Sequence, residues 1–235
     1  MKIHQVMWSL DKMRINPNTL SKKLQKVYFE GRCRHRHLYT EHPSCFKYEI
    51  LERGGTLKEG YLDIETTGFE ANYHHILTYV IKVKGEDEYY TASITKEDLD
   101  NETFDKRVCE QLIKDLNQFD IIYTYYGTGF DVPFMRSRCL YHGLPFPEFG
   151  ELQHKDVYYM AKRLLKLHRK SLEAATHFFG IKGKNHVLGK EWMCARLGHQ
   201  WALDYVMEHN IIDCDILEKL HNKLTNYSRR VTKSV

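Results

Sequence analysis

Two carboxylates, Asp63 and Glu65, stand two positions apart in the chain. The segment 61–65 alternates apolar and acidic residues, which predicts a strand with both acids on one face and Leu62 and Ile64 pointing into a core. Two neighbouring acids repel each other, and burying them costs free energy unless cations neutralise them. Carboxylate oxygens suit a hard divalent cation, Mg²⁺ or Mn²⁺. The alternative is a strand face that is simply solvated.

A third carboxylate, Asp131, follows an expected buried strand over residues 120–125. Gly127 and Gly129 precede it and allow a sharp turn or a close backbone approach to a ligand. Pro133 suits the first turn of a helix. Asp131 is therefore either a site residue or only the cap of that helix.

An expected helix over residues 201–224 carries His209 and Asp213. Their spacing of four places both on one helical face, and that face continues with apolar residues. A polar pair on a buried face needs a partner, which a metal would provide. The alternative is an ordinary ion pair between successive turns. Asp215 lies off this face and is expected to be exposed to solvent.

Four acids and one imidazole are the groups that two-metal phosphodiester hydrolysis requires. The acids would hold two Mg²⁺ or Mn²⁺ ions. His209 could take the proton of the attacking water, because the unperturbed pKa of histidine lies near neutrality. These residues together predict a metal-dependent nuclease.

Three motifs carry a family resemblance. Residues 62–68 (LDIETTG) resemble the first motif of the DEDD exonuclease superfamily, and 130–138 (FDVPFMRSR) the second, as in proofreading domains of B-family DNA polymerases. Residues 209–213 (HNIID) resemble the third, with His209 where B-family domains usually carry tyrosine. A stand-alone exonuclease, such as those encoded by phages, is a better match than a polymerase fragment.

The resemblance implies a ribonuclease-H-like fold, two divalent metals and release of nucleoside monophosphates from a 3′ end. Matched by position, it makes His209 the general base. It makes the four acids metal ligands: Asp63, Glu65, Asp131 and Asp213.

The expected order of elements agrees with this fold. Strands are expected over 61–65, 76–83, 88–93 and 120–125, and helices over 18–29, 103–118, 133–142, 155–168, 171–179 and 201–224. This order predicts an α/β domain with a mixed central sheet flanked by helices. A change of composition near Gly54-Gly55 predicts two domains: an N-terminal basic, Cys/His-rich module over 1–55 and the nuclease domain over 56–235.

The N-terminal module offers five ligands of the kind that zinc prefers: Cys33, His35, His37, His42 and Cys45. Four of them could hold a structural Zn²⁺, although the spacing is not that of a standard zinc finger. The alternative is a basic, histidine-rich loop. Arg32, Arg34 and Arg36 lie between these ligands and could contact a phosphate backbone.

The residues expected to contact nucleic acid are an aromatic side chain beside the second motif and three lysines of a glycine-containing loop: Phe130, Lys182, Lys184 and Lys190. The basic run over 162–170 is expected to be a solvated helix face. The net charge of +4 excludes a bulk polycation, so any nucleic-acid site must come from local clustering.

No apolar stretch is long enough to cross a bilayer, and the first residues carry charges too early for a secretory signal. The six cysteines form no compact disulfide framework, and Cys109, Cys139 and Cys214 are expected to be buried thiols inside helices. We therefore expect a cytoplasmic protein without a membrane partner, in the host cytoplasm if it is phage-encoded.

The leading hypothesis is a 3′–5′ exonuclease that acts on single-stranded nucleic acid, with DNA favoured over RNA. An endonuclease or an RNA-specific nuclease on the same fold is a second hypothesis. A third is a zinc-containing nucleic-acid-binding protein whose nuclease-like domain is inactive. The complete set of four acids with His209 disfavours the third.

Overall fold

The computed structural model describes residues 22–33, 35–46, 58–148, 152–183 and 187–228. The chain divides into two compact units. One comprises Met1–Glu59, Leu116–Ile122 and Pro147–Gln153, and the other comprises Gly60–Asp115, Tyr123–Phe146 and His154–Val235. The expected hinge at Gly54-Gly55 lies outside the described residues, and the domain boundary beside it stays a prediction.

The N-terminal segment forms two short helices, α2 (Lys22–Glu30) and α3 (Pro43–Phe46). Its core is aromatic: the ring of Phe46 packs edge-on against Tyr28 at 4.6 Å and against Tyr39 at 5.5 Å between centroids. All three side chains are buried. The helix predicted over 18–29 is found as α2.

Five strands form one sheet in the order β3-β2-β1-β4-β5. They are β1 (Glu59–Thr66), β2 (Ile76–Val83), β3 (Tyr89–Ser93), β4 (Ile121–Thr124) and β5 (Gln153–Asp156). β2 pairs with β1 and β3 in antiparallel register, with Asp63 opposite Val80 and Glu65 opposite Thr78. The mixed α/β fold predicted from the sequence is confirmed.

β5 was not predicted, because residues 155–156 were assigned to a helix. That assignment is wrong: Asp156 is the N-cap of α7, its carboxylate accepts the Tyr158 amide, and the helix begins only at Val157. α7 also ends at Leu164, so most of the basic run over 162–170 lies beyond it.

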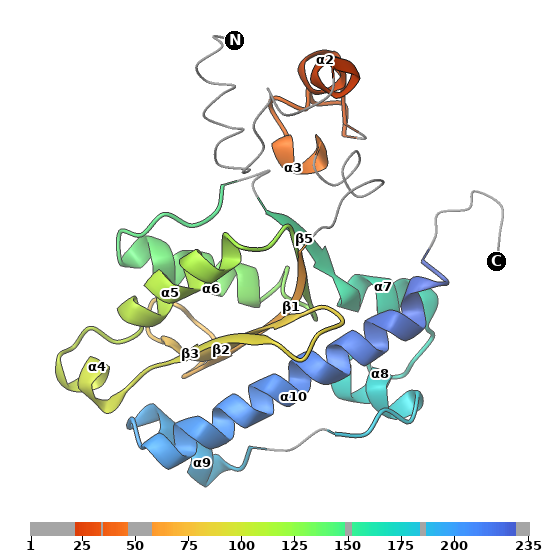
Figure 1. Ribbon diagram of the computed structural model, residues 1–235. Coiled ribbons are helices and arrows are strands. Elements are labelled where there is room, and N and C mark those ends of the chain that lie inside the picture. The colour runs from red at the N-terminus through yellow and green to blue at the C-terminus, as the bar shows by residue number, and fades with distance from the viewer. Residues whose placement is uncertain (1–21, 34, 47–57, 149–151, 184–186, 229–235) are drawn as a thin grey trace. The chain divides into compact units, whose positions relative to one another are not determined.

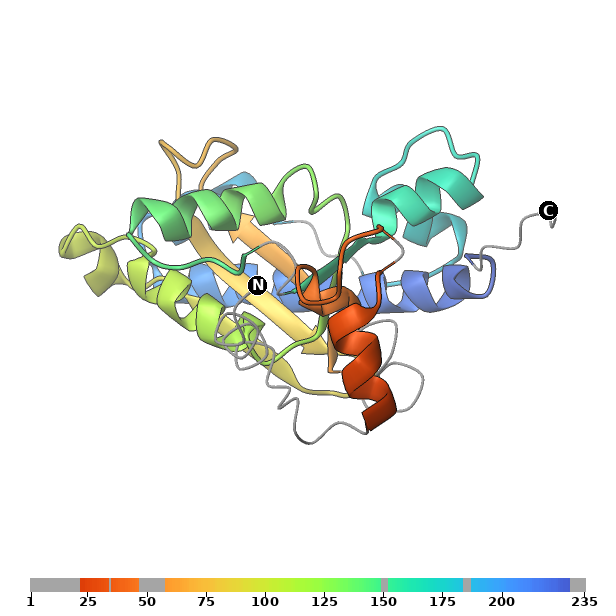
Figure 2. The ribbon, with the colours of Figure 1, turned by 90° about the horizontal axis from the view of Figure 1, so that it is seen from above.

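The helices after β3 are α4 (Lys96–Asp100), α5 (Lys106–Leu116), α6 (Asp131–Tyr141), α7 (Val157–Leu164), α8 (Leu172–Phe178), α9 (Gly189–Arg196) and α10 (Gln200–Thr225). α10 packs along β2 and contacts α7, α8 and α9 (Figures 1 and 2). α5 and α6 cover the other face of the sheet. α4 and α9 were not predicted.

Polar contacts hold α10 on the sheet. Lys82 of β2 lies 2.6 Å from Asp215 and 3.1 Å from Glu218 of α10. Asp215 also accepts the hydroxyl of Tyr89 at 2.8 Å. The expectation that Asp215 is exposed to solvent is therefore wrong, because β2 and β3 place a cation and a hydroxyl against that side of the helix.

None of the six cysteines forms a disulfide, and Cys109, Cys139 and Cys214 are fully buried as predicted. Within the described residues, no helix is long and apolar enough to span a membrane.

Candidate active site and metal centre

β1 presents Asp63 and Glu65 on the face of the sheet that α10 covers. Leu62 and Ile64 are buried, whereas both acids keep partial exposure, so the predicted alternation is confirmed. The side-chain amide of Asn210, on α10, donates to Asp63 Oδ2 at 2.6 Å. This bond ties the middle of α10 to the carboxylate-bearing strand.

α10 brings His209 and Asp213 to Glu65. His209 Nε2 lies 3.6 Å from Glu65 Oε1 and 3.8 Å from Asp213 Oδ2. One ligand atom from each of these three residues lies within 4.8 Å of the others. The group is thus more than an ion pair between two turns of one helix, because β1 contributes Glu65 as a second carboxylate.

Asp131 is the first residue of α6, and its side chain is 5% exposed. The N-cap is Phe130, which makes no side-chain cap bond, so the interpretation of Asp131 as a mere helix cap is wrong. Its carboxylate instead accepts hydrogen bonds from its own backbone amide and from that of Ile64, the residue between Asp63 and Glu65. Asp131 therefore lies beside the two acids of β1.

The pKa of Asp131 is raised to about 7, chiefly by burial and to a smaller extent by the charge of Asp156, while the two backbone hydrogen bonds oppose the shift. Near neutral pH this carboxyl holds a proton for much of the time. A divalent cation would favour the charged form and displace that proton.

The loop that carries Asp131 is held by Asp156. Its two carboxylate oxygens accept the backbone amides of Tyr126 at 2.8 Å and Thr128 at 2.9 Å. Tyr126 adopts a left-handed φ of 66°, which is strained for a non-glycine residue. A Cβ on Gly127 would lie 2.2 Å from Thr124 Oγ1, so the glycine is needed for close approach.

Asp156 and Asn210 are two polar residues that the sequence analysis did not single out. Asn210 stands beside His209 in the third motif, and that position is the only signal that could have indicated it. Asp156 precedes the apolar pattern of α7, which marks it as a cap but not as the residue that holds a loop 30 positions earlier.

Arg138, the last residue of the second motif, forms a buried ion pair with Asp105. Its guanidinium donates to both oxygens of Asp105, at 2.7 Å and 2.9 Å, and His142 Nε2 lies 2.8 Å from the same carboxylate. Burial alone would raise the pKa of Asp105, but Arg138, the Ile76 amide and His142 together hold it below its usual range. Cys109 lies close enough to Asp105 and His142 to suggest a metal group, but Arg138 already neutralises this carboxylate.

The expected nucleic-acid contacts lie outside the carboxylate cluster. Phe130 is half-buried and packs edge-on against Phe69, whose side chain is 83% exposed. Lys182 and Lys190 are exposed. Lys184 lies outside the described residues, as does Arg34.

In the N-terminal unit, Cys33, His35, His42 and Cys45 form one cluster. Nδ1 of His35 lies 3.8 Å from Cys33 Sγ and 3.3 Å from Cys45 Sγ, and His42 lies 3.5 Å from Cys33 Sγ through Nδ1 and 3.9 Å from Cys45 Sγ through Nε2. A tetrahedral Zn²⁺ with ordinary Zn–S and Zn–N bonds needs a separation of about 3.6 Å between these atoms. His37 is outside the group, with its ring edge-on to His42 at 5.6 Å. Four of the five expected ligands thus fit a zinc ion.

The donor set of the second cluster is different. It contains carboxylate oxygens and no thiolate, and oxygen ligands of this kind suit Mg²⁺ or Mn²⁺. The two clusters therefore suit two different kinds of metal.

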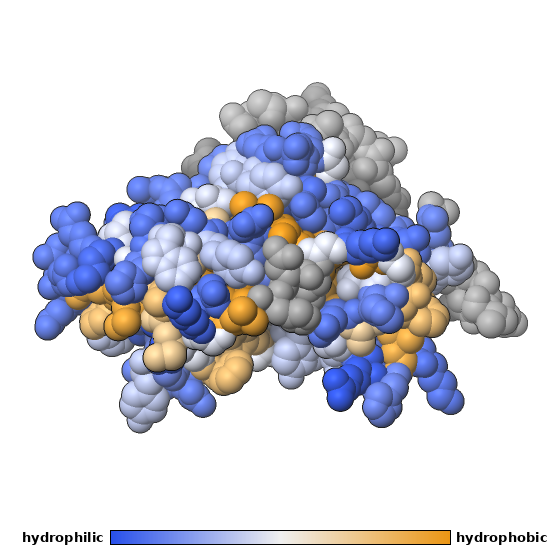
Figure 3. All heavy atoms as spheres, turned by 90° about the horizontal axis from the view of Figure 1, so that it is seen from below, coloured by the Kyte–Doolittle hydropathy of each residue, from blue (hydrophilic) through white to orange (hydrophobic). Residues whose placement is uncertain are grey.

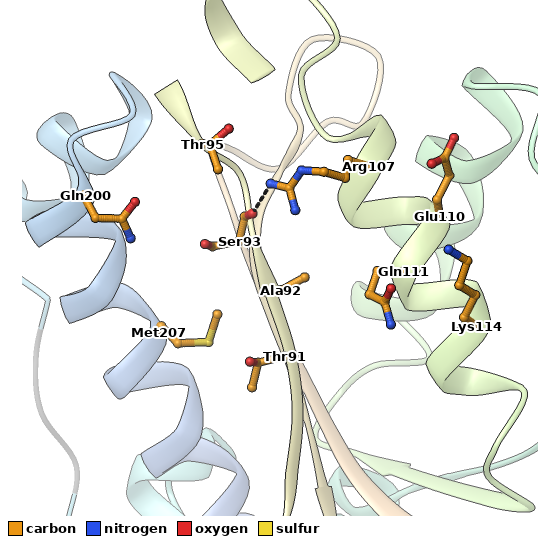
Figure 4. A pocket seen from close by; sticks show the side chains of 10 residues that line it. All are labelled: Thr91, Ala92, Ser93, Thr95, Arg107, Glu110, Gln111, Lys114, Gln200 and Met207. Atoms are coloured by element: carbon orange, nitrogen blue, oxygen red, sulfur yellow. Dashed lines mark hydrogen bonds between the residues drawn. The ribbon is translucent and has the colours of Figure 1, made fainter. Parts of the chain in front are cut away.

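A hollow of about 530 Å³ lies away from both clusters, along the free edge of β3 between α5 and α10 (Figure 4). Arg107 closes part of this edge by donating to the Ser93 carbonyl at 2.7 Å. No residue of the carboxylate cluster lines it.

Comparisons with known proteins agree with this geometry. The model of the RNase_H superfamily matches residues 60–225. A DNA polymerase of Methanocaldococcus jannaschii is 30% identical over 33% of this chain and 6% of its own length. The family B DNA polymerase of Pyrobaculum calidifontis shares the fold with a TM-score of 0.61 at 15% identity, over 73% of this chain and 25% of the polymerase.

The chain thus spans only a small part of both polymerases. The family model, in contrast, covers the sheet from β1 onward together with the acids of β1, α6 and α10. Nucleases of this superfamily generally use divalent metals and act on nucleic acid. The chain belongs to the RNase_H superfamily.

Proposed function

We propose that this protein is a metal-dependent 3′–5′ exonuclease that hydrolyses the phosphodiester bonds of single-stranded DNA. The observation that carries the proposal is the convergence of three separate elements. β1, α10 and the start of α6 contribute Asp63, Glu65, His209, Asp213 and Asp131 to one region. This chain matches only 6% and 25% of the length of the two polymerases, so the support for the activity lies in these residues.

The four acids would hold two Mg²⁺ or Mn²⁺ ions, which activate a water and stabilise the leaving 3′-oxygen when bound. Asp63 and Glu65 come from one strand face, so their spacing is set by the pleat. Asn210 orients Asp63 by donating to its Oδ2 at 2.6 Å, as residues beside metal ligands often do. Burial of Asp131 keeps water from competing with a ligand at that side.

His209 is the proposed general base. Its Nε2 faces Glu65 and Asp213 at 3.6 Å and 3.8 Å, so the ring lies among the proposed ligands. At this place it can accept the proton of a water held by those carboxylates or by their metal. Both neighbouring acids favour the imidazolium that forms.

A single strand would enter along exposed aromatic and basic side chains. Phe130, next to Asp131, and its neighbour Phe69 offer ring faces for an unpaired base. Lys182, Lys184 and Lys190 would contact the phosphate backbone. In the N-terminal module, a structural zinc would order the exposed Arg32 and Arg36 toward phosphate.

The test is stepwise shortening of a 5′-labelled single-stranded DNA in Mg²⁺ or Mn²⁺, with release of nucleoside monophosphates. Asp63→Ala and Asp213→Ala should abolish shortening, because each removes a ligand. The matched control is Asp204→Ala, an exposed acid on the same helix that pairs only with Gln200 among the described residues. Full activity of Asp63→Ala would refute the assignment.

Two parallel substrates separate the alternatives. A circular single strand should resist the enzyme, whereas cleavage of the circle would indicate an endonuclease. Preference for an RNA strand of the same sequence would indicate an RNA-specific nuclease. Tight binding of DNA with no hydrolysis in either metal would indicate an inactive nuclease-like domain.

A further inference from the structure

A second surface hollow, of about 470 Å³, opens beside the end of β1. The loop between β1 and β2 forms one wall, and α9 with the residue after it forms the other. Its lining residues are Thr67, Tyr73, His74, His75, Phe104, Met193, Arg196 and Leu197. None of the four acids or His209 lines it, so it is distinct from the proposed metal site.

The lining has the chemistry of an anion site with aromatic walls. No carboxylate is among the residues that line the hollow, although Glu70 lies 3.7 Å from the lining His74. Arg196 is exposed, and it makes no ion pair with an acid in the described part of the chain. Tyr73 is 81% exposed and Phe104 is 37% exposed. A free guanidinium beside open aromatic rings suits a phosphate joined to a planar base.

His75 contributes a neutral imidazole to this wall. Its ring lies 5.6 Å from that of Phe104. Burial lowers the pKa of His75, the charge of Asp105 opposes this shift, and Arg138, His74 and Arg196 lower it further. The positive charge offered to a phosphate therefore comes chiefly from Arg196, while His75 stays uncharged at neutral pH.

The hollow lies close to the metal-binding strand. Thr67 follows Glu65 by two positions, directly after β1 ends at Thr66. The same loop carries Phe69, which contacts Phe130 beside Asp131. On the face seen in Figure 3, hydrophobic residues gather in patches within a largely hydrophilic surface. Exposed Met193 and Leu197 of the α9 wall add apolar area that a base can cover.

We propose that this hollow binds one internal nucleotide of the single strand, next to the 3′-terminal nucleotide, with its phosphate on Arg196 and its base against Tyr73. The proposal rests on the exonuclease function and extends it, because the protein would bind an internal nucleotide of the strand as well as its 3′-terminal nucleotide. Substrates long enough to reach the hollow would bind more tightly than single-nucleotide substrates.

The test compares a ten-nucleotide oligothymidylate with the p-nitrophenyl ester of thymidine 5′-monophosphate, which carries one nucleotide and cannot reach the hollow. Arg196→Ala should raise KM for the oligonucleotide about tenfold, the loss expected for one charge-assisted hydrogen bond, and should leave hydrolysis of the ester unchanged. Arg196→Lys should restore part of the affinity. Tyr73→Ala should weaken oligonucleotide binding, whereas Tyr73→Phe should not.

The charge-matched control is Lys114→Ala, which removes one exposed cation on α5. Equal KM values for Arg196→Ala and Lys114→Ala would overturn the proposal, and so would an equal loss on both substrates. Fluorescence anisotropy of the labelled oligonucleotide in EDTA measures binding without turnover. If the wild-type protein hydrolyses neither substrate, the exonuclease function fails, while the anisotropy of Arg196→Ala still decides whether the hollow binds the strand.

Discussion

At the scale of single residues, the proposed metal site places several carboxylates close together, and their like charges disfavour the ionised forms when no cation is bound. Burial raises the pKa of Asp131, and a second carboxylate, Asp156, adds to that shift. Asp156 is itself stabilised by the amides of Tyr126, Thr128 and Tyr158, so its charge is fixed in place. Asp156 thus holds the loop, and Asp131 is the proposed metal ligand.

Asp156→Asn tests this division of roles. The two oxygens of Asp156 each accept one backbone amide of the loop, whereas asparagine has a single acceptor oxygen and its nitrogen is a donor. One of these hydrogen bonds is therefore lost, and the loop that carries Asp131 loosens. Metal affinity or activity should fall about 10- to 100-fold, as for other residues that orient metal ligands. A Mn²⁺ titration of the hydrolysis rate measures it.

The control for Asp156→Asn is Asp204→Asn, which changes an exposed acid of α10. Far-UV circular dichroism should be the same for both variants. A metal titration for Asp156→Asn that coincides with the wild type would show that the loop is held without this carboxylate.

At the scale of elements, α5 and α6 are joined by one buried charge network. Asp105 lies just before α5, and Arg138 and His142 lie in and just after α6. The Asp105 side chain is completely buried, and that of Arg138 is 5% exposed. Removal of one partner leaves the other as an uncompensated buried charge.

Asp105→Asn should therefore lower the free energy of unfolding by about 3–5 kcal/mol. The pKa of Asp105 is lower in the folded protein than in the unfolded chain, so this carboxylate stabilises the fold fully above its ordinary value of about 4. That stability is lost as the pH falls below this value and through the lower, folded pKa. Urea unfolding across this pH range measures both effects.

The difference between wild type and Asp105→Asn should therefore shrink on acidification. The difference in the free energy of unfolding could instead stay constant from neutral pH to well below the ordinary carboxyl pKa. That result would contradict a stabilising role of the ionised Asp105 carboxylate. If Asp105→Asn does not fold, Arg138→Lys keeps the charge but loses the two-bond geometry, and it should show a smaller loss.

At the scale of the whole molecule, the chain combines a nuclease-like domain with a small N-terminal Cys/His segment. In the described part of residues 22–46, the buried apolar side chains are three aromatic rings and two cysteines, which is little apolar area for so short a segment. A zinc ion on Cys33, His35, His42 and Cys45 would supply the missing stability.

We predict one zinc ion per chain and its loss in Cys33→Ser. The N-terminal unit should then unfold, because the free energy of binding a structural zinc is free energy of folding. Hydrolysis of the single-nucleotide ester should persist, since no ligand of the second cluster changes. Elemental analysis together with limited proteolysis checks the prediction.

His37→Asn is the matched control, because His37 contacts His42 but lies outside the cluster. It should retain the zinc. Loss of zinc from His37→Asn, or an unchanged zinc content in Cys33→Ser, would show that a different set of ligands is used.

Local patterns in the sequence determined much of this protein. The alternation around Asp63 and Glu65 set their shared strand face, because successive residues of a strand point to opposite sides. The spacing of His209 and Asp213 set their shared helical face for the corresponding reason. The motifs on these elements were enough to indicate the superfamily, and the number of Cys and His residues between positions 33 and 45 was enough to suggest a group that could hold a metal.

Only the tertiary structure decided how these pieces meet. Whether Asp131 caps α6 or lies beside β1 depends on where the start of that helix stands relative to Ile64, a residue 67 positions away. Asn210 meets Asp63 across 147 positions, and Lys82 meets Asp215 across 133. Contacts between distant segments depend on how a helix packs on a sheet, and neither the period of a strand nor that of a helix contains this information.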